Sequence, residues 1–148
     1  QLDALLAVHA ALAAVCGVAA LLAPGLFGIF FTGSLRDAFL RWSADSPEMR
    51  LAHVVVRLYG ALILGQAVIV WFVRGCLEAS ARRSIARAYF LVFVATSLVL
   101  LKAHVTEAFW HASGWSIVLM FVGLAASYGW FGVFGSPSVF ESVVKGVM

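Results

Sequence analysis

The stretch AHVVVRLYGALILGQAVIVWFVRG, residues 52–75, is almost entirely apolar and decides the fold class. A helix needs about 20 such residues to cross the hydrocarbon core of a bilayer, and this stretch provides them. Just before it, Ser46 suits an N-cap, Pro47 suits the first helical position and Glu48 suits the positive end of the helix dipole. We therefore expect a membrane-spanning helix over about residues 51–73.

The composition of the whole chain indicates the same environment. Of its 148 residues, 64% are hydrophobic and 11% are charged, and the mean hydropathy is +1.03. A soluble domain is roughly half apolar and a quarter charged. Three further apolar stretches predict spans over about residues 4–23, 85–105 and 115–134. We expect a single membrane domain over residues 1–148, an all-α, integral membrane four-helix bundle.

The ends of the chain and its connecting segments give weaker indications. The first apolar stretch is similar to a signal peptide, but its length and the absence of a basic segment before it favour a spanning helix. From Gln1 in place of methionine we expect a chain trimmed from a longer precursor, with a disordered or cut terminus as the alternative. Segments of about residues 34–43 and 138–147 carry apolar side chains on one helical face. They are expected to be short interfacial helices, or ordinary amphipathic connectors.

The basic residues predict the orientation in the membrane. The loop between the second and third spans has four arginines and one acid, namely Arg74, Arg82, Arg83, Arg87 and Glu78. The positive-inside rule places this loop and both termini on the cytoplasm-like side. The formal net charge of +3 is small and scattered, so nucleic acid is not an expected partner, and contact with lipid headgroups is.

Arg57 lies inside the second span, where a charged side chain is costly unless it is paired or reaches the interface. Glu107 follows the third span on the same side of the membrane, so we predict an intramembrane ion pair between Arg57 and Glu107. Snorkelling of Arg57 and a role in binding a headgroup or an ion are the alternatives. The close helix packing that such a pair requires is indicated by three small-xxx-small motifs, Ala61-x3-Gly65, Gly123-x3-Ser127 and Ala125-x3-Gly129.

Four side chains near the outer ends of the second and third spans are candidate pigment or metal ligands: His53, His104, Glu107 and His111. The last three share one helical face if the third helix continues. A zinc site needs three or four converging ligands, and a di-iron site needs paired Glu-x-x-His motifs that the chain lacks. We therefore expect no metal, and favour interfacial histidines beside an aromatic belt that includes Trp110 and Trp115.

The sequence offers no catalytic set. Thr96 and Ser97 in the third span, and Ser127 in the fourth, have no histidine at their depth to act as a base. The chain also lacks a phosphate-binding glycine loop and paired carboxylates. His9, alone in the first span, is expected to be a hydrogen-bonded histidine of the bundle interior. The prediction is that the protein is not an enzyme.

Three runs of the sequence resemble a known family: LLAPGLFGIFF (residues 21–31), VRLYGALILGQAVIVW (56–71) and ARAYFLVFVATSLVLLKAHVTE (86–107). They are similar to a small four-helix membrane protein family that includes a vertebrate tumour-suppressor-inducible transmembrane protein and uncharacterised bacterial relatives. The resemblance covers the first three spans and centres on Arg57-Leu58-Tyr59-Gly60. It implies a helical bundle with an arginine in the second span, and no established catalytic chemistry.

Short loops, the missing catalytic set and an aromatic content of 14% favour a non-catalytic accessory or structural subunit of a larger membrane assembly. A photosynthetic or respiratory supercomplex of an organelle membrane, thylakoid or inner mitochondrial, is the kind considered. Other integral membrane subunits and lipids are the expected partners, and bound lipid, chlorophyll or carotenoid are the cofactors considered. The alternatives are a small oligomeric ion channel or carrier that uses Arg57 and Glu107, and an orphan membrane enzyme with a histidine-cluster metal site.

Overall fold

The computed structural model describes residues 2–33, 36–37, 47–75, 78–107 and 111–135. These residues form the helices α1 (Leu2–Leu22), η1 (Pro24–Phe30), α3 (Pro47–Arg74), α4 (Ala79–Thr106), α5 (Gly114–Gly129) and η2 (Trp130–Phe134). Four helical segments are long and apolar enough to cross a membrane, with α5 and η2 forming one span. The predicted all-α, multi-pass membrane bundle is therefore confirmed.

The helix bounds agree with the predicted spans, and α3 and α4 extend beyond them. α3 begins at Pro47, as the sequence indicates, and α4 begins at Ala79, about one and a half turns before the predicted span. The expected interfacial helix over residues 138–147 lies outside the described residues. Nearly all of the one expected over 34–43 does so too. A short 3₁₀ helix, η1, follows α1 where only an exit from the membrane was expected.

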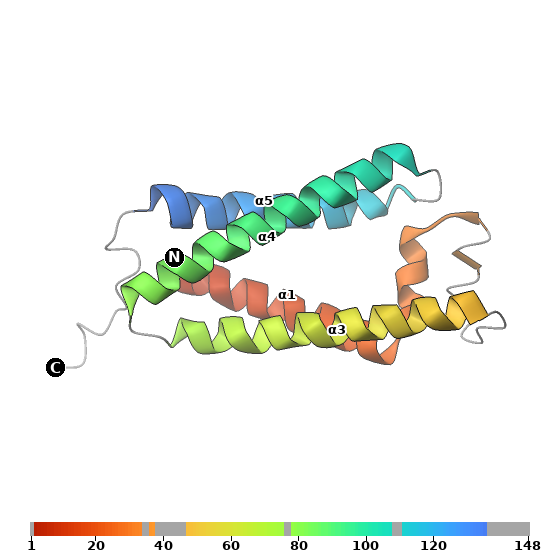
Figure 1. The fold of residues 1–148 in the computed structure, drawn as a ribbon, viewed down its shortest axis with the longest axis horizontal. Coiled ribbons are helices and arrows are strands. Elements are labelled where there is room, and N and C mark those ends of the chain that lie inside the picture. The colour runs from red at the N-terminus through yellow and green to blue at the C-terminus, as the bar shows by residue number, and fades with distance from the viewer. Residues whose placement is uncertain (1, 34–35, 38–46, 76–77, 108–110, 136–148) are drawn as a thin grey trace.

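The spanning helices associate as two pairs. α1 packs along α3, and α4 packs along α5. Figure 1 shows the two pairs as two layers that approach each other near the start of α1. At the opposite end α4 rises away from α3, and η1 stands between the layers (Figure 1). We call the end at which the two layers meet the closed end of the bundle. At the opposite end, η1 separates the layers.

α1 and α3 cross at two glycines, Gly17 and Gly60. A Cβ atom on Gly17 would lie 2.9 Å from the carbonyl oxygen of Gly60. A Cβ atom on Gly60 would lie 2.6 Å from the Cβ of Ala20 and 2.9 Å from the carbonyl oxygen of Gly17. Glycine is therefore required at both positions for the two backbones to touch, as in other closely packed membrane helices.

The three predicted small-residue motifs have different outcomes. Ala125 is buried, and Gly129 lies against the Phe90 ring of α4, so this motif does pack two helices together. Ala61, Gly65 and Gly123 are exposed, and nothing lies within 4 Å of a Cβ placed on Gly65 or Gly123. These two motifs face outward because α3 uses its Gly60 side against α1, and α5 uses its Gly129 side against α4.

The closed end of the bundle holds the core. Its buried side chains come from all four spans: Leu2, Leu6, Ala10, Val70, Ala86, Tyr89, Phe93, Leu124, Ala125 and Tyr128. The rings of Tyr89, Phe93 and Tyr128 lie with their centroids 5.5–5.7 Å apart. Where the π-helical turn η2 widens the end of the last span, Arg87 Nε donates a hydrogen bond of 3.0 Å to the carbonyl oxygen of Gly132.

Candidate functional site

A part-buried ion pair joins α1 to α4, and it is not the predicted one. Arg82 Nη2 donates to the carboxylate of Asp3. The Arg82 side chain is 1% exposed, whereas that of Asp3 is 47% exposed. The sequence contains a signal for this pair, because both residues lie at the start of a span and the starts of the first and third spans share one side of the membrane.

The predicted pair between Arg57 and Glu107 does not form in the part of the chain that the structure describes. α4 pairs with α5, and its end rises away from α3 (Figure 1). Glu107 is an exposed residue directly after α4, and its backbone N–H donates to the carbonyl oxygen of Ala103 at 2.9 Å. The prediction failed because the span order does not determine which helices are neighbours.

The predicted histidine cluster does not assemble either. α4 ends at Thr106, so His104, Glu107 and His111 do not share one helical face. The His104 ring packs 5.1 Å from that of Trp115, while the His111 backbone N–H donates to the carbonyl oxygen of Phe30 at 2.8 Å. Among residues 2–33, 36–37, 47–75, 78–107 and 111–135, no three potential metal ligands converge.

The segment around His111 instead fastens η1 to the start of α5. The Ser113 hydroxyl donates to the carbonyl oxygen of Ile29 at 2.7 Å, and His111 Nδ1 lies 2.9 Å from the same hydroxyl. His53, the remaining candidate ligand, is buried on α3. The hydrogen bonds from the segment around His111 hold η1 in place between the two helix pairs.

His9 lies at the centre of the bundle, as the sequence indicates. Its side chain is 3% exposed, and Nδ1 makes a hydrogen bond of 2.7 Å with the Tyr128 hydroxyl. The rings of Tyr89, Phe93 and Tyr128 surround it edge-on at 4.9–5.5 Å. His9 also lines a cavity of about 60 Å³ with Gln66, and all four spans contribute to that cavity.

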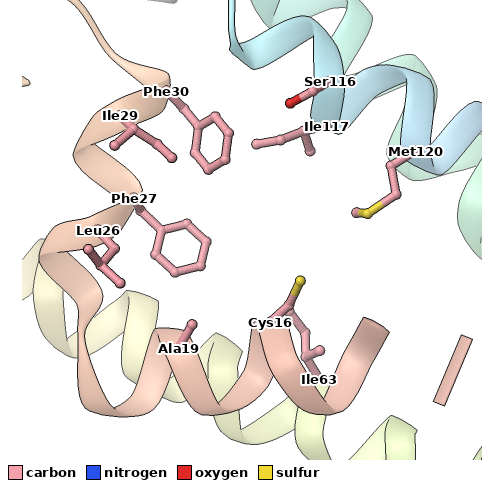
Figure 2. Close-up of a pocket in the computed structure, with 10 residues that line it drawn as sticks. All are labelled: Cys16, Ala19, Leu26, Phe27, Ile29, Phe30, Ile63, Ser116, Ile117 and Met120. Atoms are coloured by element: carbon pink, nitrogen blue, oxygen red, sulfur yellow. The ribbon is translucent and has the colours of Figure 1, made fainter. Parts of the chain in front are cut away.

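A larger chamber of about 360 Å³ lies between η1 and α5, with α1 and α3 behind it. Figure 2 shows the side chains of Phe27, Phe30 and Ile117 pointing into it, with Cys16 and Met120 at its inner side. The Ser116 hydroxyl and the Cys16 thiol are the polar groups of this lining, and its other side chains are apolar. Such a lining favours the apolar part of a ligand.

The outward face of α3 carries the remaining polar feature. Arg57, Ala61 and Gly65 are spaced by four residues, so they lie one above another on the same face, and all three are exposed. Arg57 makes no hydrogen bond or ion pair within the described residues. It lies about 26 Å along the helix from Arg74, which is within the roughly 30 Å thickness of a hydrocarbon core.

No family model, curated protein or solved structure matches this chain. Among the described residues, the outward face of α3 and the chamber with its adjoining cavity combine polar side chains with an unfilled surface or space. The first presents a charge and two small residues to the surroundings, and the second encloses space next to polar side chains.

Proposed function

We propose that the protein is a non-catalytic accessory subunit of a larger membrane assembly, and that a partner helix binds the outward face of α3. The observation that carries the proposal is the position of Arg57 on that face. A guanidinium remains ionised, and its exposure on a spanning helix is unfavourable without an anionic group beside it.

The spanning helices that the structure describes do not provide that group at the depth of Arg57. Residues 51–74, 79–106 and 114–134 contain no aspartate or glutamate, and Asp3, the acid of the first span, pairs with Arg82 at the opposite end. The spans of a second copy would bring the same shortage inside the membrane. The complementary carboxylate is therefore assigned to a different membrane protein.

The two small residues fit the same interface. Ala61 and Gly65 follow Arg57 by one and two helical turns, so a partner helix along this stripe would approach closely while its carboxylate meets the guanidinium. At the other end of α3, the Arg74 guanidinium lies 4.7 Å from the centre of the Trp71 ring. A tryptophan beside an arginine at a helix end is typical of a membrane interface. This anchor and the arginines near it support the orientation with the closed end on the cytoplasm-like side.

The channel or carrier alternative rested on a path between Arg57 and Glu107. Because α4 diverges from α3, these two side chains do not line a common path in the described structure. The alternative enzyme rested on the histidine cluster, whose members lie on separate segments. The accessory subunit is thus the function that the geometry supports best.

Two matched glycine variants test the interface. Gly65 and Gly123 are both exposed glycines of spanning helices with nothing within 4 Å of an added Cβ. On native gels of gently solubilised membranes, we expect the chain to migrate in a large complex, Gly65→Leu to release it, and Gly123→Leu to leave it bound. Arg57→Leu should release it as well, because the partner carboxylate loses its counter-charge.

Two results of the native gels would contradict the proposed partner interface. If the unaltered chain migrates alone or as a small homo-oligomer, or if Gly65→Leu and Gly123→Leu behave alike, the outward face of α3 is a lipid-facing surface and the accessory role is wrong.

A further inference from the structure

The chamber and the smaller cavity are lined by none of Arg57, Ala61 and Gly65, the residues of the proposed partner interface. The chamber of about 360 Å³ is more than twice the size of an apolar cavity of about 150 Å³ that binds benzene. Cys16, Ile63 and Met120 line both this chamber and the inner cavity of about 60 Å³, so the two volumes adjoin. Together they extend from η1 to His9 and Gln66, the two polar side chains in the lining of the inner cavity.

The polar end is provided by His9 and Gln66. His9 Nδ1 and the Tyr128 hydroxyl share one hydrogen bond, whose direction depends on the His9 tautomer. In the tautomer in which the hydroxyl donates, the neutral ring carries its proton on Nε2, where no hydrogen bond is made within the described residues. The Gln66 amide makes none there either, and it lines the same cavity. Because polar groups inside a bundle are normally hydrogen-bonded, two unused donors beside one cavity indicate an acceptor that is supplied by a ligand.

We propose that the cavities bind a neutral, lipid-soluble ring compound of the quinone type, with its ring in the chamber and one carbonyl oxygen in the inner cavity. A carbonyl oxygen has two lone pairs, so it accepts from His9 Nε2 and from the Gln66 amide together. The ring then lies among Phe27, Phe30 and Ile117, where aromatic and aliphatic contacts replace an apolar void.

Other ligands meet only one of the two requirements, which are an apolar group for the chamber and a neutral hydrogen-bond acceptor for His9 and Gln66. A plain hydrocarbon chain fills the chamber but offers no acceptor to His9 or Gln66. A fatty acid offers an acceptor, but its carboxylate would be ionised at the centre of a bundle without a cation there, which is strongly unfavourable. A neutral carbonyl on an apolar ring meets both requirements.

Two probes that share a decyl chain on a six-membered ring separate these cases: decylubiquinone, which has ring carbonyls, and decylbenzene, which has none. We would add each at equal mole fraction to the detergent-solubilised full chain and record the unfolding temperature by circular dichroism. A ligand that binds the folded state raises this temperature. We expect a rise with decylubiquinone and little or none with decylbenzene.

Variants then locate the bound probe. Gln66→Leu and His9→Phe should each require about tenfold more decylubiquinone for the same rise, which is the loss expected for one hydrogen bond. Ile117→Trp should abolish the rise by placing an indole ring where the ring of the probe would lie. Thr96→Val is the matched control, since its hydroxyl bonds to the carbonyl oxygen of Val92 in its own helix, 2.8 Å away, and it lines neither cavity.

Three results would overturn the proposal. The first is an equal rise in unfolding temperature with both probes, and the second is no rise with either probe. The third is a response to decylubiquinone that is unchanged in both single variants, Gln66→Leu and Ile117→Trp. Gln66→Leu keeps the bundle contacts of His9 intact, so the test does not depend on whether His9→Phe folds.

Discussion

Replacing Gly60 with leucine is expected to separate α1 from α3 and to lower the free energy of unfolding by about 3 kcal/mol, the upper end of the range for overpacked sites. The added Cβ would lie 2.6 Å from the Cβ of Ala20 and 2.9 Å from the backbone oxygen of Gly17. Backbone atoms cannot turn aside as a flexible side chain can, so the helices have to move apart. Unfolding of the purified protein by SDS titration in mixed micelles measures the loss.

Gly65→Leu, on the same helix, is the control for this experiment. Nothing lies within 4 Å of its added Cβ, so the stability of the isolated chain should change by no more than about 0.5 kcal/mol. Equal losses for the two variants would show that α1 and α3 do not cross at Gly17 and Gly60.

The second large effect is expected at the Asp3–Arg82 pair. Asp3→Leu leaves a guanidinium that is 1% exposed without this carboxylate, and we expect it to cost about 3 kcal/mol, the lower end of the range for breaking a buried pair. Arg82→Met should cost less, because the remaining carboxylate is 47% exposed and is therefore hydrated. The same SDS titration compares the two variants.

The double variant completes the cycle. If the pair is formed, Asp3→Leu together with Arg82→Met should be destabilised by much less than the sum of the two single changes, because no buried charge has lost its partner. Strictly additive losses would mean that the two side chains do not interact in the membrane.

The spans were predictable because the apolar stretches are long and the charges fall between them. The bounds of α3 follow from Pro47 at its start and Arg74 at its end, and both can be identified in the sequence. Which helices are neighbours was not predictable from the hydropathy pattern, since a spanning helix must hide its backbone from lipid whatever stands beside it. The wrong partner for Arg57 follows directly from this limit.

The small residues of the first span carry a signal for one helix contact. Ala10, Ala13, Gly17 and Ala20 recur every three or four residues of the first span, and all are buried. This stripe predicts the α1 face that meets Gly60, yet the motifs considered lay in later spans. The Asp3–Arg82 pair was missed for a different reason, because Arg82 was assigned to a loop and the structure places it in the first turn of α4.

The chamber could not be predicted from the sequence. It exists because η1 holds the helix pairs apart, and η1 is fastened by hydrogen bonds from His111 and Ser113 to the backbone of Phe30 and Ile29. Contacts between such distant segments leave no periodic signal. The residues that line the chamber, such as Phe27 and Ile117, look like ordinary lipid-facing side chains in the sequence.

The most direct test of the central claim is photo-crosslinking in native membranes. A photoreactive phenylalanine analogue would replace Ala61, which lies between Arg57 and Gly65, and in a second variant Leu98, which is 62% exposed on α4. After irradiation, mass spectrometry would identify what each position touches. We expect a single membrane protein other than this chain at position 61, with a carboxylate in its crosslinked helix, and lipid at position 98. Lipid at both positions would contradict it.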